Sequence, residues 1–238
     1  MPHLHNLKED VCRTNLKLVE EGLVRLTWGN ASGIDRERGL VVIKPSGVPY
    51  SAMTAKDMAV VDLDGKRVAG EYRPSSDTIT HLVLYKAFPL IGAVVHTHSG
   101  WATSWAQACR EIPCLGTTHA DHFYGPVPCT RLLTPAEING NYEEATGLVI
   151  REAFALLNPM EVPGVLVAEH GPFTWGATLK EALHHAIILE EIARLAFRTV
   201  LLGKDFAVQR EILEKHYSRK HGPGAYYGQD DRSGRQGN

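Results

Sequence analysis

The sequence has few cysteines, and none of them forms a close pair. The 238-residue chain contains four, Cys12, Cys109, Cys114 and Cys129, with no Cys-x-x-Cys motif among them. Small secreted domains that depend on disulfides have a much higher cysteine density, and thiol redox motifs have a closer spacing. The cysteine pattern therefore predicts reduced thiols in a cytoplasmic protein.

Long apolar runs and blocks of one charge are also missing. No stretch approaches 18 uninterrupted apolar residues, so no segment is expected to span a bilayer. The first ten residues have neither a basic start nor an apolar run, so a signal peptide is not expected. The formal net charge is −2 and no basic block occurs, which argues against nucleic acid or an anionic membrane as partner. A glycine-rich fingerprint in a βαβ unit is absent too, which disfavours a nucleotide cofactor.

The hydrophobic content and the apolar runs of the sequence predict a fold that mixes helices and strands. Hydrophobic residues make up 44% of the chain, enough to bury a full core in one large domain or two small ones. The run 40–43 predicts a buried strand, and 60–63 followed by Asp64-Gly65 predicts a hairpin. Hairpins mixed with helices favour an α/β sandwich around a mostly antiparallel or mixed sheet.

Further elements follow from periodicity and turn signals. A strand pair is expected at 164–167 and 173–175, with His170, Gly171 and Pro172 at the bend. Residues 228–238 contain no apolar side chain and are expected to form a disordered tail. The predicted helices are an opening helix with Leu7, Val11, Leu18 and Val19 on one face, segments near 78–88, 99–109, 142–157 and 179–202, and a last helix to about residue 217.

The most informative motif is Val-Val-His-Thr-His at 94–98, an apolar strand that ends in two histidines. In a strand, residues i and i+2 share a face with Cα atoms ~6.6 Å apart, so His96 and His98 can offer both imidazoles to one cation. Asp77 and His170 stand at other turns between apolar segments. One aspartate and three histidines suit Zn²⁺, with Mn²⁺ or Co²⁺ as substitutes. Histidines at strand ends can also be ordinary polar residues, and the spacing alone does not separate the two interpretations.

Seven segments resemble the L-ribulose-5-phosphate 4-epimerase family of the class II aldolase/epimerase superfamily. They occur in order, and the resemblance extends from about residue 7 to residue 229. The segments are LTWGN at 26–30, IKPSG at 43–47, PSSD at 74–77, HTH at 96–98, GTTHAD at 116–121, EHGPF at 169–173 and AYYGQ at 225–229.

The resemblance implies a fold, an assembly and a metal site. The family fold is a three-layer α/β/α sandwich around a mostly antiparallel sheet, which implies one domain over residues 1–227. Family members are usually homotetramers with active sites between subunits. Asp77, His96, His98 and His170 would hold one divalent metal ion per subunit, with Zn²⁺ as the favoured ion.

The implied reaction is inversion at C4, which interconverts L-ribulose 5-phosphate and D-xylulose 5-phosphate. The family route is retro-aldol cleavage and re-addition through a metal-stabilised enediolate, with Asp121 and Tyr227 as the acid/base pair. On residue chemistry alone, Asp121 would be a turn or capping carboxylate and Tyr227 a packing aromatic.

The resemblance also implies a site for the substrate phosphate. Small polar turns can direct backbone N–H and hydroxyl groups at an anion, and a lysine adds a charge. Each turn by itself is typical of ordinary loops. The implied phosphate residues are Gly29, Asn30, Lys44, Ser46, Gly47, Ser75 and Ser76, and the residues expected at the edge of the site are Thr117, His119, His216 and Arg219.

Two other functions remain open from the sequence. One is a class II sugar-phosphate aldolase, similar to L-fuculose-1-phosphate aldolase, which would stop after cleavage; such aldolases typically carry Glu at the position of Asp77. The other is a noncatalytic metal-binding relative, which would be expected to lack some of these residues. The pathway, arabinose or ascorbate-type degradation, is not determined by the motifs. His81, His184 and His185 fall on predicted helices and are expected to be surface or packing residues.

Overall fold

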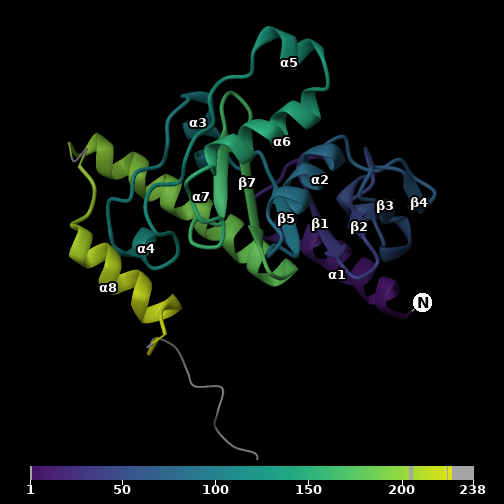
Figure 1. The fold of residues 1–238 in the computed structure, drawn as a ribbon, viewed down its shortest axis with the longest axis horizontal. Helices are drawn as coiled ribbons and strands as arrows, with labels where there is room; N and C mark the ends of the chain where they lie inside the picture. The colour runs from purple at the N-terminus through teal and green to yellow at the C-terminus, as the bar shows by residue number, and fades with distance from the viewer. Residues whose placement is uncertain (1, 204–205, 224, 227–238) are drawn as a thin grey trace, which may run out of the picture.

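A seven-stranded sheet forms the centre of the molecule (Figure 1). The computed structural model describes residues 2–203, 206–223 and 225–226. The strand order is β4-β3-β2-β1-β5-β7-β6, and every pair of neighbouring strands is antiparallel, which confirms the predicted sheet. The strands are β1 (Asn30–Asp35), β2 (Leu40–Ile43), β3 (Ala59–Asp62), β4 (Arg67–Ala69), β5 (Ala93–His96), β6 (Gly164–Val167) and β7 (Gly171–Gly176).

Helices cover both faces of this sheet. Within the described residues, none of them has the length and apolar composition needed to cross a membrane. The α-helices are α1 (Pro2–Glu20), α2 (Thr78–Ala87), α3 (Gly100–Gln107), α4 (Thr117–Ala120), α5 (Pro135–Asn139), α6 (Tyr142–Ala153), α7 (Leu179–Leu201) and α8 (Arg210–His221), and two short 3-10 helices are η1 (Tyr50–Ala52) and η2 (Ala55–Asp57).

Two hydrophobic cores lie on opposite faces of the sheet, because successive side chains of a strand point to opposite sides. In β5, Val94 belongs to the core beneath α2, α3 and α6, whereas Ala93 and Val95 belong to the core beneath α1. Helix α7 starts in the α1 core with Ala182 and reaches the other core with Leu189. These helix and sheet layers confirm the expected three-layer sandwich.

The central strand β1 is the main element that periodicity does not predict. Its sequence, Asn-Ala-Ser-Gly-Ile-Asp, lacks an apolar run, yet its first four residues are buried. Asn30 was expected in a turn and is instead the first residue of this strand. The buried polar side chains of Asn30 and Ser32 are tolerated because both form hydrogen bonds with residues of the α2 region.

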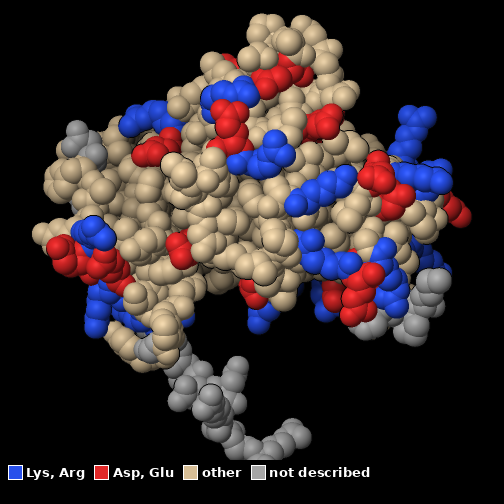
Figure 2. Space-filling model, in the orientation of Figure 1, with Lys and Arg blue, Asp and Glu red and all other residues tan. Residues whose placement is uncertain are grey.

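Other boundaries also differ from the prediction. Gly171 and Pro172, expected at a bend, are the first two residues of β7, and the Pro172 carbonyl accepts a hydrogen bond from the Thr97 N–H. The last helix was expected to end near residue 217, but α8 continues to His221. Its polar residues His216 and His221 form hydrogen bonds with Asp121, and a hydropathy pattern does not detect such contacts. The short helices α4 and α5 were not expected. On the face shown in Figure 2, basic and acidic side chains are interspersed, as the small net charge suggests.

Candidate metal centre and active site

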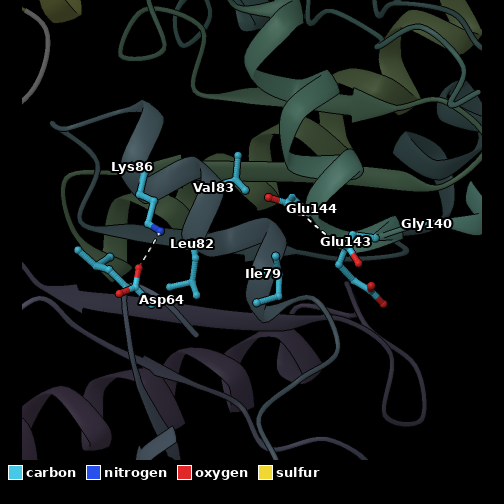
Figure 3. A pocket seen from close by; sticks show the side chains of 10 residues that line it. Asp64, Ile79, Leu82, Val83, Lys86, Gly140, Glu143 and Glu144 are labelled. Carbon is cyan, nitrogen blue, oxygen red and sulfur yellow. Dashed lines mark hydrogen bonds and ion pairs between the residues drawn. The ribbon is translucent and has the colours of Figure 1, made fainter. Parts of the chain in front are cut away.

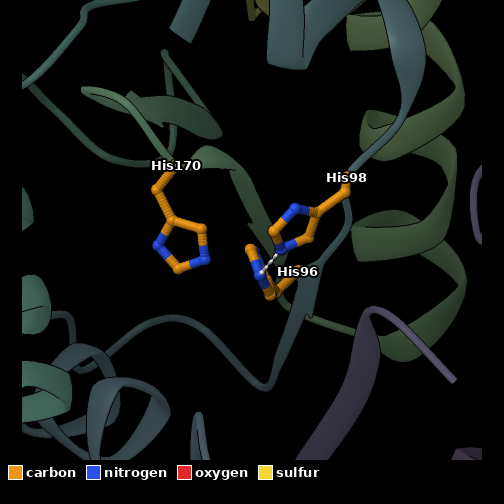
Figure 4. A group of neighbouring side chains, drawn as sticks. All are labelled: His96, His98 and His170. Atoms are coloured by element: carbon orange, nitrogen blue, oxygen red, sulfur yellow. Dashed lines mark hydrogen bonds between the residues drawn. The ribbon is translucent and has the colours of Figure 1, made fainter. Parts of the chain in front are cut away.

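Three histidines from two distant parts of the chain converge at the ends of adjacent strands (Figure 4). His96 is the last residue of β5, His98 lies two residues later, and His170 directly precedes β7. Pairing of β5 with β7 places His96 opposite Phe173, which brings His170 to the same edge. One nitrogen from each ring lies within 4.8 Å of the others, a separation at which one cation can contact all three.

The orientation of His96 follows from its contacts. Its Nδ1 lies 3.0 Å from the Pro172 carbonyl oxygen, which can only accept a hydrogen bond, so Nδ1 carries the proton. The Nε2 lone pair is then available, and this atom lies 3.1 Å from His98 Nε2. The His96 ring also stacks on Phe173 with centroids 4.1 Å apart. A carbonyl that holds the second ring nitrogen is the usual support of a metal-binding histidine.

The other two imidazoles are kept neutral by their surroundings. Burial lowers the pKa of His170 to about 3, with further lowering from His96 and His98. Burial and then His96 also lower the pKa of His98. Tyr142, a residue that the sequence did not indicate, places its hydroxyl 3.4 Å from His170 Nδ1. Neutral imidazole is the form that coordinates a metal ion, so the rings of His98 and His170 can act as ligands near neutral pH.

The backbone around the histidines is tightly constrained. Glu169, next to His170, has a φ of +60°, a left-handed conformation that non-glycine residues seldom adopt. Gly29 has a φ of +78°, and a Cβ at this position would lie 2.8 Å from the His96 carbonyl oxygen. A larger residue at position 29 would therefore displace the end of β5 that carries His96.

Asp77, the fourth expected ligand, is not part of this group of side chains within 4.8 Å of one another, although its charge acts on His98 and His170. It occupies the N-cap position of α2, and its Oδ2 accepts a hydrogen bond of 2.6 Å from the Asn30 amide. Burial by itself raises the pKa of Asp77, but His96, His81 and the Asn30 bond outweigh it and hold the pKa below the usual value. A carboxylate and three imidazoles are the donor types that a divalent cation such as Zn²⁺ prefers.

The family of this chain is shown by its similarity to known proteins. Residues 9–197 match the family model described as the class II aldolase and adducin N-terminal domain. The chain belongs to this class II aldolase family. This family is metal-dependent, which agrees with the convergence of the three histidines.

Similar proteins cover almost the whole chain. L-ribulose-5-phosphate 4-epimerase UlaF of Salmonella paratyphi A is 54% identical over 228 residues, which is 95% of this chain and 100% of the relative. The protein of the same name from Salmonella typhi has the same identity and coverage. Among solved structures, an L-fuculose 1-phosphate aldolase has a TM-score of 0.76 at 26% identity, covering 90% of this chain and 95% of that one.

The residues implied for phosphate binding in the class II aldolase family lie together beside Asp77. Asn30 Nδ2 donates to Ser75 Oγ at 3.1 Å, and the Ser75 N–H donates to the Lys44 carbonyl at 3.0 Å. An isolated bridge between Pro45 and Pro74 joins the two loops. The exposed residues of this group are Ser46, Gly47 and Ser76.

Lys44 is the buried cation of this cluster, with only 2% of its surface exposed. Burial lowers the pKa of Lys44, and the charge of Asp77 acts in the opposite direction. Its Nζ donates to the carbonyls of Thr27 at 3.3 Å and Pro45 at 3.4 Å and lies 4.8 Å from the centre of the Tyr50 ring. An anion at this place would supply the negative charge that a buried ammonium group favours.

Asp121 lies in another part of the molecule. It follows α4, and Figure 1 shows α4 beside α8 at one end of the fold, whereas β5 is near the centre. Its carboxylate accepts hydrogen bonds from His216 Nδ1 at 3.0 Å and from Arg219 at 2.9 and 3.1 Å, and Lys220 Nζ lies 3.6 Å away. Burial opposes these contacts, but together they hold the pKa of Asp121 below its usual range.

The structure does not bring Asp121 to the histidine triad of the same chain. The charged groups that act on His98 and His170 include Asp77 but not Asp121, and those that act on Asp121 come from α8. Thr117 begins α4, and His216 and Arg219 of α8 gather with Asp121 rather than with the triad. Tyr227 lies outside the described residues, as does the segment 228–238.

One cavity of the molecule is not lined by the histidine triad. A cavity of about 500 Å³ lies between the β3–β4 hairpin, α2 and the start of α6, with Lys86 and Asp64 paired at 3.5 Å on one side (Figure 3). Glu143 and Glu144 line the opposite side. None of the three histidines of the triad lines this cavity, so we do not assign it to the metal centre.

His119, expected at the edge of the site, is a buried residue of α4. It is 4% exposed, and its Nε2 donates to the Gly125 carbonyl at 2.8 Å. Burial lowers the pKa of His119 to about 4, although the bond to Gly125 raises it. Since an unfolded histidine titrates near 6.5, the unfolded state binds the proton first as the pH falls.

His119 is therefore expected to make the fold less stable in acid. Between pH 7 and pH 4.5 it should lower the free energy of unfolding by roughly 2 kcal/mol, because each pKa unit corresponds to 1.36 kcal/mol. His119→Gln keeps a donor for Gly125 and removes the titration, so this part of the loss should disappear. Urea unfolding of the metal-free wild type and variant at both pH values measures the change in the free energy of unfolding. An equal decrease in the variant would contradict the role of His119.

Proposed function

We propose that this protein is a metal-dependent C4 epimerase that interconverts L-ribulose 5-phosphate and D-xylulose 5-phosphate. The observation that carries the proposal is its 54% identity, over 95% of the chain, to proteins named L-ribulose-5-phosphate 4-epimerase. The convergence of the three histidines supports the metal requirement, and Asp77 would be the fourth ligand. Zn²⁺ is the favoured ion, and Mn²⁺ or Co²⁺ would suit the same ligands.

The reaction needs carbon–carbon cleavage because C4 lies two bonds from the ketone and its hydrogen is not acidic. Breaking the C3–C4 bond, turning the aldehyde fragment and adding it back to its other face inverts this carbon. Asp77, His96, His98 and His170 would hold a divalent cation, which would supply Lewis acidity for the negative charge left on the ketone fragment. Asn30, Lys44 and Ser75 would hold the phosphate while the aldehyde carbon turns.

The acid/base steps would be carried out by Asp121 and Tyr227. Arg219 and His216 keep Asp121 ionised, which is the form that accepts a proton from the C4 hydroxyl. Because Asp121 lies apart from the triad of its own chain, a neighbouring subunit would supply it. A homotetramer with active sites between subunits, as the family resemblance implies, meets this requirement.

The decisive experiment is incubation of the Zn²⁺-loaded protein with L-ribulose 5-phosphate. Formation of D-xylulose 5-phosphate, followed by a coupled assay and confirmed by NMR of the sugar, is expected. The competing function, cleavage alone, is suggested by the similarity to an L-fuculose 1-phosphate aldolase. Cleavage alone would release dihydroxyacetone and glycolaldehyde phosphate and would not form D-xylulose 5-phosphate. This result would reject the epimerase proposal and support an aldolase function.

A further inference from the structure

Helix α3 begins two residues after His98, and its first turn is held by a side chain of α7. The N–H of Trp101 donates to Glu190 Oε1 at 2.8 Å, and the N–H of Ala102 donates to Oε2 of the same carboxylate at 2.9 Å. The first N–H groups of a helix have no partner within the helix, and a negative charge is favourable at this end. Glu190 therefore stabilises the start of α3 from a distant part of the chain.

The residue that would usually cap this helix does not do so. Ser99 occupies the N-cap position, where a serine hydroxyl commonly accepts a hydrogen bond from one of the first N–H groups. Its side chain makes no capping bond, and its buried Oγ has no hydrogen-bond partner among the described residues. The local sequence after His98 thus does not fix the start of α3 through its own cap, and Glu190 takes this role.

The position of His98 depends on the start of α3. His96 belongs to β5 and is fixed by pairing with Asn30 on one side and Phe173 on the other. His98 instead lies in the short connection between β5 and α3. The next residue, Ser99, already accepts a helical hydrogen bond at its carbonyl, from the N–H of residue 103 at 2.9 Å. A displacement of the first turn of α3 would therefore move His98 relative to His96.

Helix α7 contacts both segments that carry the histidine triad. One turn beyond the carboxylate contact, the Trp105 indole of α3 donates to the Ala193 carbonyl of α7 at 3.0 Å, so two polar contacts set the position of α3. On the same helix, His185 Nδ1 donates to the Trp175 carbonyl at 2.7 Å. Trp175 belongs to β7, the strand that directly follows His170. α7 can therefore hold the two segments in a fixed relation to each other.

We propose that Glu190 is a positioning residue of the metal centre, which fixes the first turn of α3 and so places His98 beside His96 and His170. The inference rests on the proposed metal centre and extends it by one residue outside the ligand set. Direct hydrogen-bond partners of metal ligands change metal affinity by roughly 10- to 100-fold when they are replaced. Because Glu190 acts on His98 through the backbone of α3, its effect belongs at the lower end of this range.

Two substitutions of Glu190 are compared with a matched control on the same helix. Glu190→Ala removes both acceptors, whereas Glu190→Gln keeps one acceptor oxygen. Thr178→Ala is the control, because Thr178 caps α7 by accepting from the Glu181 N–H at 3.2 Å, about 18 Å from Glu190 along the helix. We expect the dissociation constant for Zn²⁺, measured by competition with a chromophoric chelator, to rise about 10-fold in Glu190→Ala. It should rise less in Glu190→Gln and stay unchanged in Thr178→Ala.

Loading with Co²⁺ separates the ligand geometry from the general stability of the fold. The visible absorption of bound Co²⁺ depends on the type and arrangement of its ligands. Glu190→Ala should change this spectrum, and Thr178→Ala should keep the wild-type spectrum. Urea unfolding without metal measures the stability of each variant. If Glu190→Ala does not fold, Glu190→Gln takes its place in the comparison with Thr178→Ala.

The outcomes distinguish the role of Glu190 from the metal centre itself. Wild-type protein that binds no Zn²⁺ would overturn the centre and this proposal with it. Wild-type binding together with an unchanged dissociation constant and an unchanged Co²⁺ spectrum in Glu190→Ala would overturn only the role of Glu190. An equal loss of affinity in Thr178→Ala would also overturn this role, because general loosening of α7 would then explain the effect.

Discussion

Replacing His98 by Asn is expected to lower epimerase turnover by about 1000-fold and to reduce the bound metal. His98 Nε2 lies 3.1 Å from His96 Nε2, where the two ring nitrogens face the same ion position. An asparagine amide is a weaker ligand than a neutral imidazole and would not reach the same point. Loss of the Lewis acid removes several kcal/mol of charge stabilisation, and each 1.36 kcal/mol is a factor of ten in rate. Metal analysis and steady-state kinetics measure the two effects.

His184→Asn is the control for this experiment. His184 is an exposed histidine of α7 that does not belong to the triad, so its replacement should leave metal content and rate close to the wild-type values. Treatment of the wild type with a chelator should abolish turnover, and Zn²⁺ or Mn²⁺ should restore it. Full activity in a sample verified to be free of metal would contradict the proposed centre.

Asp121→Asn is expected to reduce epimerisation by roughly 100- to 10,000-fold while the metal stays bound. A positioned acid/base group contributes about this factor, and the amide cannot accept the proton. Because asparagine has nearly the same shape, it can keep part of the contact with His216 and Arg219. Zn²⁺ content and urea unfolding of the variant test whether the centre and the fold persist. Wild-type turnover would remove Asp121 from the mechanism.

Mixing inactive variants tests which chain supplies Asp121. In a mixture of His98→Asn and Asp121→Asn subunits, a shared site can combine the intact triad of one chain with the intact Asp121 of its neighbour. Activity should then return after subunit exchange, because each chain lacks a different half of the site. No recovery despite proven exchange, or an active monomer by light scattering, would place the whole site within one chain. Tyr227→Phe mixed with Asp121→Asn shows whether these two residues come from the same neighbour.

Local sequence patterns were sufficient for part of the site and for most of the layers. The spacing of His96 and His98 predicted a shared face because strand geometry depends on residues two positions apart. Asp64-Gly65 predicted a hairpin, and the long apolar face near 179–202 predicted the helix α7, because turn chemistry and helical periodicity also depend on residues close in the sequence. The same local reasoning did not predict β1, because its inward side chains are polar and are satisfied by α2.

The sequence by itself determined the ligand types, the pair of histidines at the end of one strand, the alternation that gives the sheet two apolar faces, and the family resemblance. Only the tertiary structure decided that His170 reaches this pair and that Asp121 lies with α8. The physical reason is the range of the interactions. Periodicity and turn chemistry act over a few residues, whereas these contacts join positions brought together by strand pairing and helix packing.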